Sequence, residues 1–107
     1  MFIANTATPY YAVIFTSQRT EEDKKNYMKT AELMIEFASK QEGFLGVDRT
    51  CDLEGLEITV SYWVSLEAIK QWKENDSHRK VKEKGKQDWY SSYSTRICKV
   101  EREYSNI

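Results

Sequence analysis

Hydrophobic and polar residues alternate strictly between Leu56 and Val64, which is typical of a strand with one buried face. One face of this strand would carry Leu56, Ile58, Val60 and Tyr62. The other face would carry Glu57, Thr59, Ser61 and Trp63. Residues 44–51 predict a preceding strand, and the turn-forming residues 52–55 between the two strands predict a hairpin.

A first strand and a helix are predicted ahead of this hairpin. Residues 10–15 form a short aromatic and β-branched run, which predicts a buried strand. Thr20 can cap a helix whose first turn carries the acids of residues 21–23. Gly43 predicts the end of this helix. In between, apolar residues recur at helical spacing, at Tyr27, Met28, Ala31, Met34, Ile35 and Ala38.

A second helix and a last strand are predicted after the hairpin. Ser65 can cap the helix, and Trp72 lies on its predicted buried side. The helical pattern is interrupted at Asn75, and the charged residues around Lys82 in the next turns predict a solvated face. The last strand is expected to run from about residue 91 to residue 104. A strand of that length would outrun its own sheet, which favours pairing beyond the monomer.

The order strand, helix, hairpin, helix, strand is the β-α-β-β-α-β pattern of ferredoxin-like domains, an α+β fold that we expect to contain an antiparallel sheet. We expect residues 1–9 to form an N-terminal arm and residues 10–107 to form a single domain. Two helices would cover one face of the sheet and leave apolar groups exposed on the other. A second copy of the chain on that face would make a homodimer and leave a cavity between sheet and helices.

Length and charge narrow the possible functions. The chain has 107 residues, the length of one domain, and a net charge of −1. Nucleic-acid binding needs a concentrated basic surface, so it is not expected. No secretory signal is evident and no apolar stretch is long enough to cross a membrane, so a cytoplasmic location is expected. Cys51 and Cys98 form no disulfide or metal motif, and we expect no metal site. The 3 Trp, 7 Tyr and 4 Phe residues predict either an aromatic core or a pocket.

Several aromatic and glycine positions together resemble a known family. Residues 62–72 read Tyr-Trp-Val-Ser-Leu-Glu-Ala-Ile-Lys-Gln-Trp, and Gly-Phe-Leu-Gly stands at 43–46. With His78, Gly85 and the aromatic residues further on, residues 10–104 resemble the antibiotic biosynthesis monooxygenase (ABM) domain family. The resemblance implies a dimeric α+β barrel in which the sheets of two copies meet. It also implies a place among cofactor-independent oxygenases, haem-degrading monooxygenases, quinol oxygenases and members without an assigned activity.

The haem-degrading branch implies an Asn on the first strand, a Trp on the second helix and a His about ten residues later. Trp72 is similar to that Trp, but Lys82 stands where the His would be, and residues 10–17 contain no Asn. His78 lies one helical turn earlier and could serve only if the helix break turns it inward. We therefore expect no cofactor, and haem degradation remains the second alternative.

The cofactor-free branch implies an Asn and a Trp on the third strand and a Tyr on the following helix. Trp63 is similar to that Trp, whereas Thr59 and Ile69 stand at the other two positions. The resemblance therefore implies cofactor-independent oxidation of a small aromatic or quinol-like substrate in a pocket between sheet and helices. The first alternative is a homodimer that binds or senses a small ligand without catalysis.

Three residues, His78, Trp63 and Arg96, are candidates for catalysis. His78 is the single imidazole, and an ordinary pKa of about 6.5 suits proton transfer near neutral pH, although its neighbours suggest a surface turn. Trp63 could form a pocket wall or fill the core, and Arg96 could hold a substrate oxygen or pair with an interface acid. An RNA-binding role is not expected, because residues 56–63 lack the aromatic pattern of RNA-binding sheets. The predicted substrate pocket contains Thr59, Tyr62, Trp72, Tyr90 and Tyr93.

Overall fold

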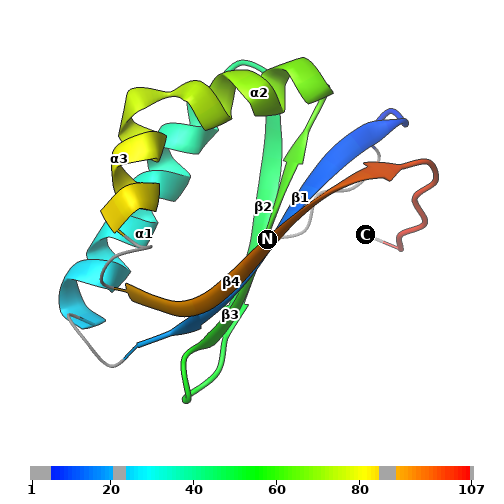
Figure 1. Ribbon diagram of the computed structural model, residues 1–107. Coiled ribbons are helices and arrows are strands. Elements are labelled where there is room, and N and C mark those ends of the chain that lie inside the picture. The colour runs from blue at the N-terminus through cyan, green and yellow to red at the C-terminus, as the bar shows by residue number, and fades with distance from the viewer. Residues whose placement is uncertain (1–5, 21–23, 85–88, 107) are drawn as a thin grey trace.

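A computed structural model describes residues 6–20, 24–84 and 89–106. The elements are β1 (Tyr10–Arg19), α1 (Lys24–Ser39), β2 (Phe44–Cys51), β3 (Leu56–Trp63), α2 (Leu66–Glu74), α3 (Asp76–Lys84) and β4 (Tyr90–Val100). The strands form an antiparallel sheet in the order β2-β3-β1-β4, and the helices lie together on one face of it (Figure 1). The ferredoxin-like α+β fold is confirmed, with the second helix divided in two. The acids at residues 21–23, predicted to open α1, lie outside the described residues.

The break between α2 and α3 follows from local hydrogen bonding. Ser65 caps α2, because its Oγ accepts a hydrogen bond from the Ala68 amide at 3.1 Å. Asn75 ends α2 with an extended backbone, and its amide donates to the Trp72 carbonyl at 3.1 Å. The side chain of Asn75 then accepts from the His78 amide at 3.4 Å, which satisfies a donor in the first turn of α3. One residue therefore closes the first helix and opens the next in a new direction.

Gly43, between α1 and β2, is required by both its backbone angle and its neighbours. Its φ is +87°, a region that side chains other than glycine rarely adopt. A Cβ atom at this position would lie 2.6 Å from the Cβ of Ala68 and 2.9 Å from the Cγ2 of Val64. The absence of a side chain thus lets the start of α2 pack directly against the turn that follows α1.

The core lies where α1 and α2 meet the end of β3. Trp63 is completely buried there, and its ring packs edge-on against Phe44 with the centroids 5.4 Å apart. This cluster fills the space between helices and sheet near the end of β3 that leads into α2. The buried residues of the cluster are Ala38, Trp63, Ala68, Ile69 and Trp72.

The last strand is shorter than predicted. β4 ends at Val100, whereas the sequence pattern favoured a strand to about residue 104. Glu103 accounts for the difference, because its carboxylate accepts hydrogen bonds from the Tyr10 hydroxyl at 2.7 Å and the Thr6 amide at 3.2 Å. These contacts hold the C-terminal residues against the start of β1, so the chain no longer continues along the sheet.

We expect Gly43→Ala to lower the free energy of unfolding by about 1–3 kcal/mol, because a methyl group would meet both strain and a close contact. Urea denaturation followed by circular dichroism would measure this change. Glu32→Ala, at an exposed position of α1, is the control and should change stability by less than about 0.5 kcal/mol. Equal midpoints for wild type and Gly43→Ala would contradict the close packing described here.

Candidate functional site

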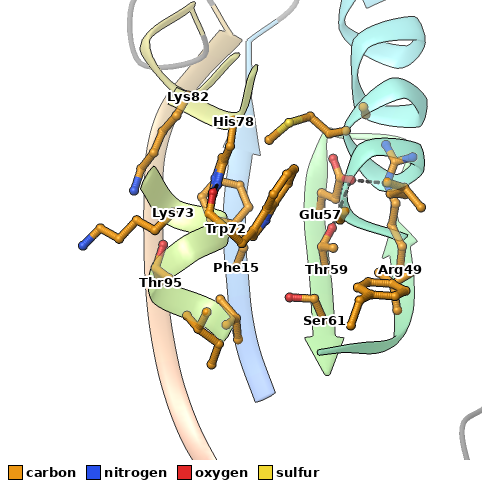
Figure 2. A pocket seen from close by; sticks show the side chains of 18 of the residues that line it. Phe15, Arg49, Glu57, Thr59, Ser61, Trp72, Lys73, His78, Lys82 and Thr95 are labelled. Atoms are coloured by element: carbon orange, nitrogen blue, oxygen red, sulfur yellow. Dashed lines mark hydrogen bonds and ion pairs between the residues drawn. The ribbon is translucent and has the colours of Figure 1, made fainter. Parts of the chain in front are cut away.

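A cavity of about 380 Å³ lies between the helices and the inner face of the sheet. Its size is within the range of pockets that hold small organic ligands. Most of its wall is apolar or aromatic, including Val13, Phe15, Met34, Ile35, Phe44 and Ile69. Polar side chains gather in two groups on opposite sides of the view in Figure 2, around Glu57 and around His78.

The first group, which we call the inner polar cluster, consists of Tyr27, Arg49, Glu57 and Thr59. Glu57 is 4% exposed, and its carboxylate accepts hydrogen bonds from the Tyr27 hydroxyl and from Nε of Arg49. The Thr59 hydroxyl donates to the same carboxylate at 3.4 Å. A buried carboxylate is tolerated only when it is paired and hydrogen-bonded in this way. The cluster therefore places a matched pair of charges inside the cavity.

Burial changes the acidity of the phenols beside this cluster. Burial, followed by the hydrogen bond to Glu57, raises the pKa of Tyr27 far above its usual value. Burial and the negative charge of Glu57 raise the pKa of Tyr90 to about 12, and the neighbouring Tyr27 side chain and the charge of Arg49 oppose this increase. Both phenols therefore stay protonated near neutral pH and act as hydrogen-bond donors.

Two buried donors near the inner polar cluster have no hydrogen-bond partner among the described residues. These are Nη2 of Arg49 and Nε1 of Trp89, and both residues contribute to the cavity wall. Trp89 packs edge-on against Tyr27 with ring centroids 5.5 Å apart. A buried donor without a partner costs about 1–3 kcal/mol. This end of the cavity thus holds more donors than the described residues satisfy.

His78 forms the second polar group at the cavity wall. Its imidazole stacks on Trp72 with centroids 4.6 Å apart, and its Nδ1 lies 3.0 Å from the Trp72 carbonyl oxygen. A carbonyl oxygen can only accept a hydrogen bond, so Nδ1 carries a proton and donates. In the neutral ring Nε2 then keeps its lone pair and can accept a proton.

The surroundings of His78 keep the imidazole neutral. Burial lowers its pKa below the ordinary value, although the hydrogen bond to the Trp72 carbonyl opposes this effect. The ammonium groups of Lys82 and Lys73 lower the pKa of His78 further, because a second positive charge beside them is unfavourable. Lys82 lies at the cavity wall, so the solvated face predicted around it is incomplete.

The structure brings four of the predicted site residues to the cavity wall: His78, Thr59, Trp72 and Tyr90. The break at Asn75 turns His78 inward, which meets the condition that the sequence left open. A register shift between Gln18 and Arg19 in the pairing of β1 with β4 explains Tyr90. This irregularity interrupts the alternation of side chains between the two faces of the sheet, so Tyr90 lies on the same face as Phe15.

The other four predicted residues lie elsewhere. Trp63 is in the core, where its Nε1 donates to Ser61 at 2.9 Å. Tyr62 lies on the outer face of the sheet and donates to Asp48 at 2.7 Å. Arg96 is an exposed residue on that same outer face, one position from the wall residues of β4. Tyr93 is 43% exposed and contacts the ring of Tyr90, outside the cavity wall.

Of the inner polar cluster, only Thr59 was predicted from the sequence as a pocket residue. The alternation of β3 placed Glu57 on the correct face of the strand but indicated no role for it. The available signal was the position of an acid on a face that also carries Trp63, since a buried acid requires a partner. The partner, Arg49, could not be found from spacing alone, because it comes from the neighbouring strand β2.

Within residues 6–20, 24–84 and 89–106, no group of three or more His, Cys, Asp or Glu side chains is placed to hold a metal ion. The helices in those ranges are too short or too polar to span a bilayer.

Comparisons with known proteins find one family model, a curated relative and solved structures that share the fold. The sequence model described as antibiotic biosynthesis monooxygenase matches residues 10–84. The uncharacterised protein YqjZ of Bacillus subtilis (strain 168) is 47% identical over 103 residues, covering 95% of this chain and 90% of YqjZ. Among solved structures, Rv0793 of Mycobacterium tuberculosis has a TM-score of 0.79 at 13% identity, covering 92% of this chain and 100% of that one. SnoaB, a cofactor-independent oxygenase from Streptomyces nogalater, has a TM-score of 0.78 at 7% identity, covering 91% and 98%.

We expect the pKa of His78, the only histidine of the chain, to lie below about 6.5 in a proton NMR titration of its ring. Removing positive charge favours the imidazolium, so the double variant Lys73→Gln, Lys82→Gln should raise this pKa. The double variant Lys70→Gln, Lys80→Gln removes the same charge from the same two helices and should leave the pKa nearly unchanged. An unshifted pKa in the wild type would contradict the burial of His78.

Proposed function

This chain belongs to the antibiotic biosynthesis monooxygenase family, and on that premise we propose that it is a monooxygenase that oxidises a small aromatic or quinol-like substrate without a cofactor. One observation carries the proposal: the imidazole of His78, whose Nδ1 is held by the Trp72 carbonyl, lies at the wall of a largely apolar cavity. The fold shared with SnoaB, a cofactor-independent oxygenase, adds support by analogy.

The proposed reaction begins with proton transfer to His78. Nε2 of the neutral ring accepts a proton from an acidic substrate position and leaves an electron-rich anion in the cavity. The apolar wall excludes water from this anion, and the charges of Lys73 and Lys82 stabilise it from the side of His78. The protein therefore contributes a base, a dry environment and compensating charge.

Molecular oxygen completes the reaction, and the substrate supplies all the electrons. A new C–O bond forms at the substrate carbon, the O–O bond breaks, and a CH₂ group becomes C=O. The second oxygen atom leaves as water together with the two hydrogen atoms of the CH₂ group. Because the substrate is the reductant, the reaction needs neither a nucleotide nor a flavin.

We expect oxygen uptake with an anthrone as substrate, at a rate above the spontaneous reaction measured without protein. His78→Gln keeps the size of the side chain and removes the base, so it should lower kcat by about 100-fold or more. Arg79→Gln, at an exposed neighbouring position, should retain the wild-type rate. A full rate in His78→Gln would contradict the assignment of the base. The absence of uptake, with saturable anthrone binding, would favour a ligand-binding or sensing protein.

Haem degradation is a second candidate, because His78 faces the cavity. Its Nδ1 is tied to the Trp72 carbonyl, an arrangement that commonly orients a metal-ligating imidazole. His78 would hold haem iron through Nε2, and haem would supply the oxygen-activating chemistry. Titration with haemin separates the candidates. A saturable shift of the Soret band that disappears in His78→Gln, followed by bleaching with a reductant in air, would favour haem degradation.

We also propose that the protein is a homodimer that pairs through the outer face of its sheet. The helices cover only the opposite face (Figure 1), and Leu56 and Ile58 are 42% and 38% exposed on the outer one. Apolar side chains exposed on the face of a sheet favour coverage by another surface. A second copy supplies a matching surface by symmetry.

Ile58→Lys should convert the dimer to a monomer in size-exclusion chromatography with light scattering, because it places a charge on the proposed interface. Leu53→Lys is the matched control, since Leu53 is fully exposed in the turn between β2 and β3. We expect this control variant to remain a dimer. A wild-type monomer at micromolar concentration, or a dimer that survives Ile58→Lys, would overturn the proposed interface.

A further inference from the structure

We propose that the cavity entrance recognises an anion, and that the ligand is a small aromatic carboxylate whose ring lies inside the cavity and whose carboxylate lies beside Lys73 and Lys82. This inference deepens the proposed function, because it adds a permanent negative charge to the aromatic substrate. It concerns binding alone, so it can succeed or fail independently of any oxygen chemistry.

The exposed wall residues locate the entrance. Tyr27, Glu57, Trp72 and Trp89 are wall residues that are buried, whereas Ile97 on β4 is 52% exposed. Lys73 on α2 and Thr95 on β4 are also exposed wall residues. The cavity therefore opens between the α2–α3 pair and β4. In Figure 2, the side chains of Lys73 and Lys82 extend toward the side of β4 on which Thr95 lies.

The charge of the wall is uneven from one end to the other. Glu57 is the one acid among the described wall residues, and Arg49 already matches its charge in the inner polar cluster. At the entrance, Lys73 and Lys82 add positive charge, and both lower the pKa of His78, so their field reaches the cavity wall. The whole chain has a net charge of −1, so this positive entrance is a local feature.

The two ends together define the ligand. At the inner end, Nη2 of Arg49 and Nε1 of Trp89 can donate to a neutral ligand oxygen, whereas an anion there would lose its hydration and lie beside the carboxylate of Glu57. At the entrance, the same anion keeps part of its hydration and gains attraction to Lys73 and Lys82. The aromatic and aliphatic wall between the ends, formed by residues such as Phe15 and Met34, accepts a flat apolar body. An aromatic ring with one carboxylate at its edge matches this arrangement. The ring fits the apolar wall, and the carboxylate lies beside the two lysines at the entrance.

The test compares two probes of similar size, naphthalene-2-carboxylate and 2-naphthol, by isothermal titration calorimetry at low salt. We expect the carboxylate to bind about threefold to tenfold more tightly, the range set by one or two partly exposed ion pairs. Raising the salt concentration should reduce this preference, because salt screens exposed charges. Lys73→Gln, Lys82→Gln should abolish the preference, whereas Lys70→Gln, Lys80→Gln should retain it.

A second readout comes from the only histidine. A bound carboxylate near Lys73 and Lys82 favours the imidazolium, so naphthalene-2-carboxylate should raise the pKa of His78 in an NMR titration. Bound 2-naphthol should not raise it. This measurement holds even if the lysine variants lose stability, because it uses the wild-type chain.

Several results would overturn the inference. Equal affinity for the two probes would overturn it. An equal loss of the preference for the carboxylate in both lysine double variants would also overturn it, because a general charge effect would then explain the preference. Failure of both probes to bind would reject an aromatic ligand at this cavity. Preference for the carboxylate without any oxygen uptake would support the entrance and count against the proposed oxidation. Turnover of a neutral anthrone, with no preference for the carboxylate probe, would support the proposed oxidation and count against anion recognition at the entrance.

Discussion

A stack of three rings connects the core of this protein to its cavity. Trp63 is fully buried, Trp72 stacks on it with centroids 6.2 Å apart, and His78 stacks on Trp72 at 4.6 Å. The same Trp72 supplies the carbonyl that fixes the proton on Nδ1 of His78. The position, tautomer and neutral state of the imidazole therefore depend on packing that begins in the core. The break at Asn75 matters for the same reason, because it aims α3 so that His78 can join the stack.

The cavity separates two kinds of polarity that serve different purposes. In the inner polar cluster, Glu57 and Arg49 neutralise each other, so this end can hold a ligand without a charge of its own. Around His78, burial and then the charges of two lysines lower the pKa of the imidazole, and the lysines also attract negative charge. A substrate that becomes anionic during reaction benefits from the second feature directly.

Much of the fold could be predicted from the sequence, because helix caps, turn residues and strand alternation each depend on only a few neighbouring residues. Ser65 caps its helix, and alternation on β3 sorts side chains onto two faces. Gly43 lies in the turn after α1, although α1 itself ends at Ser39 and not at Gly43 as predicted. That alternation also separated Tyr62 from Thr59, so the prediction of both in one pocket conflicted with the pattern itself. The family resemblance rested on the same local signals, since its residues occupy β3 and α2.

The sequence by itself determined the order of the elements and the face on which each residue of β3 lies. Only the tertiary structure decided how deeply each residue of a sheet face is buried. It placed Trp63 in the core and Thr59 at the cavity. It also decided the pairing of Arg49 with Glu57 across two strands, and the inward turn of His78. The physical reason is that a period of two specifies a side of the sheet, whereas burial depends on which helix covers that position.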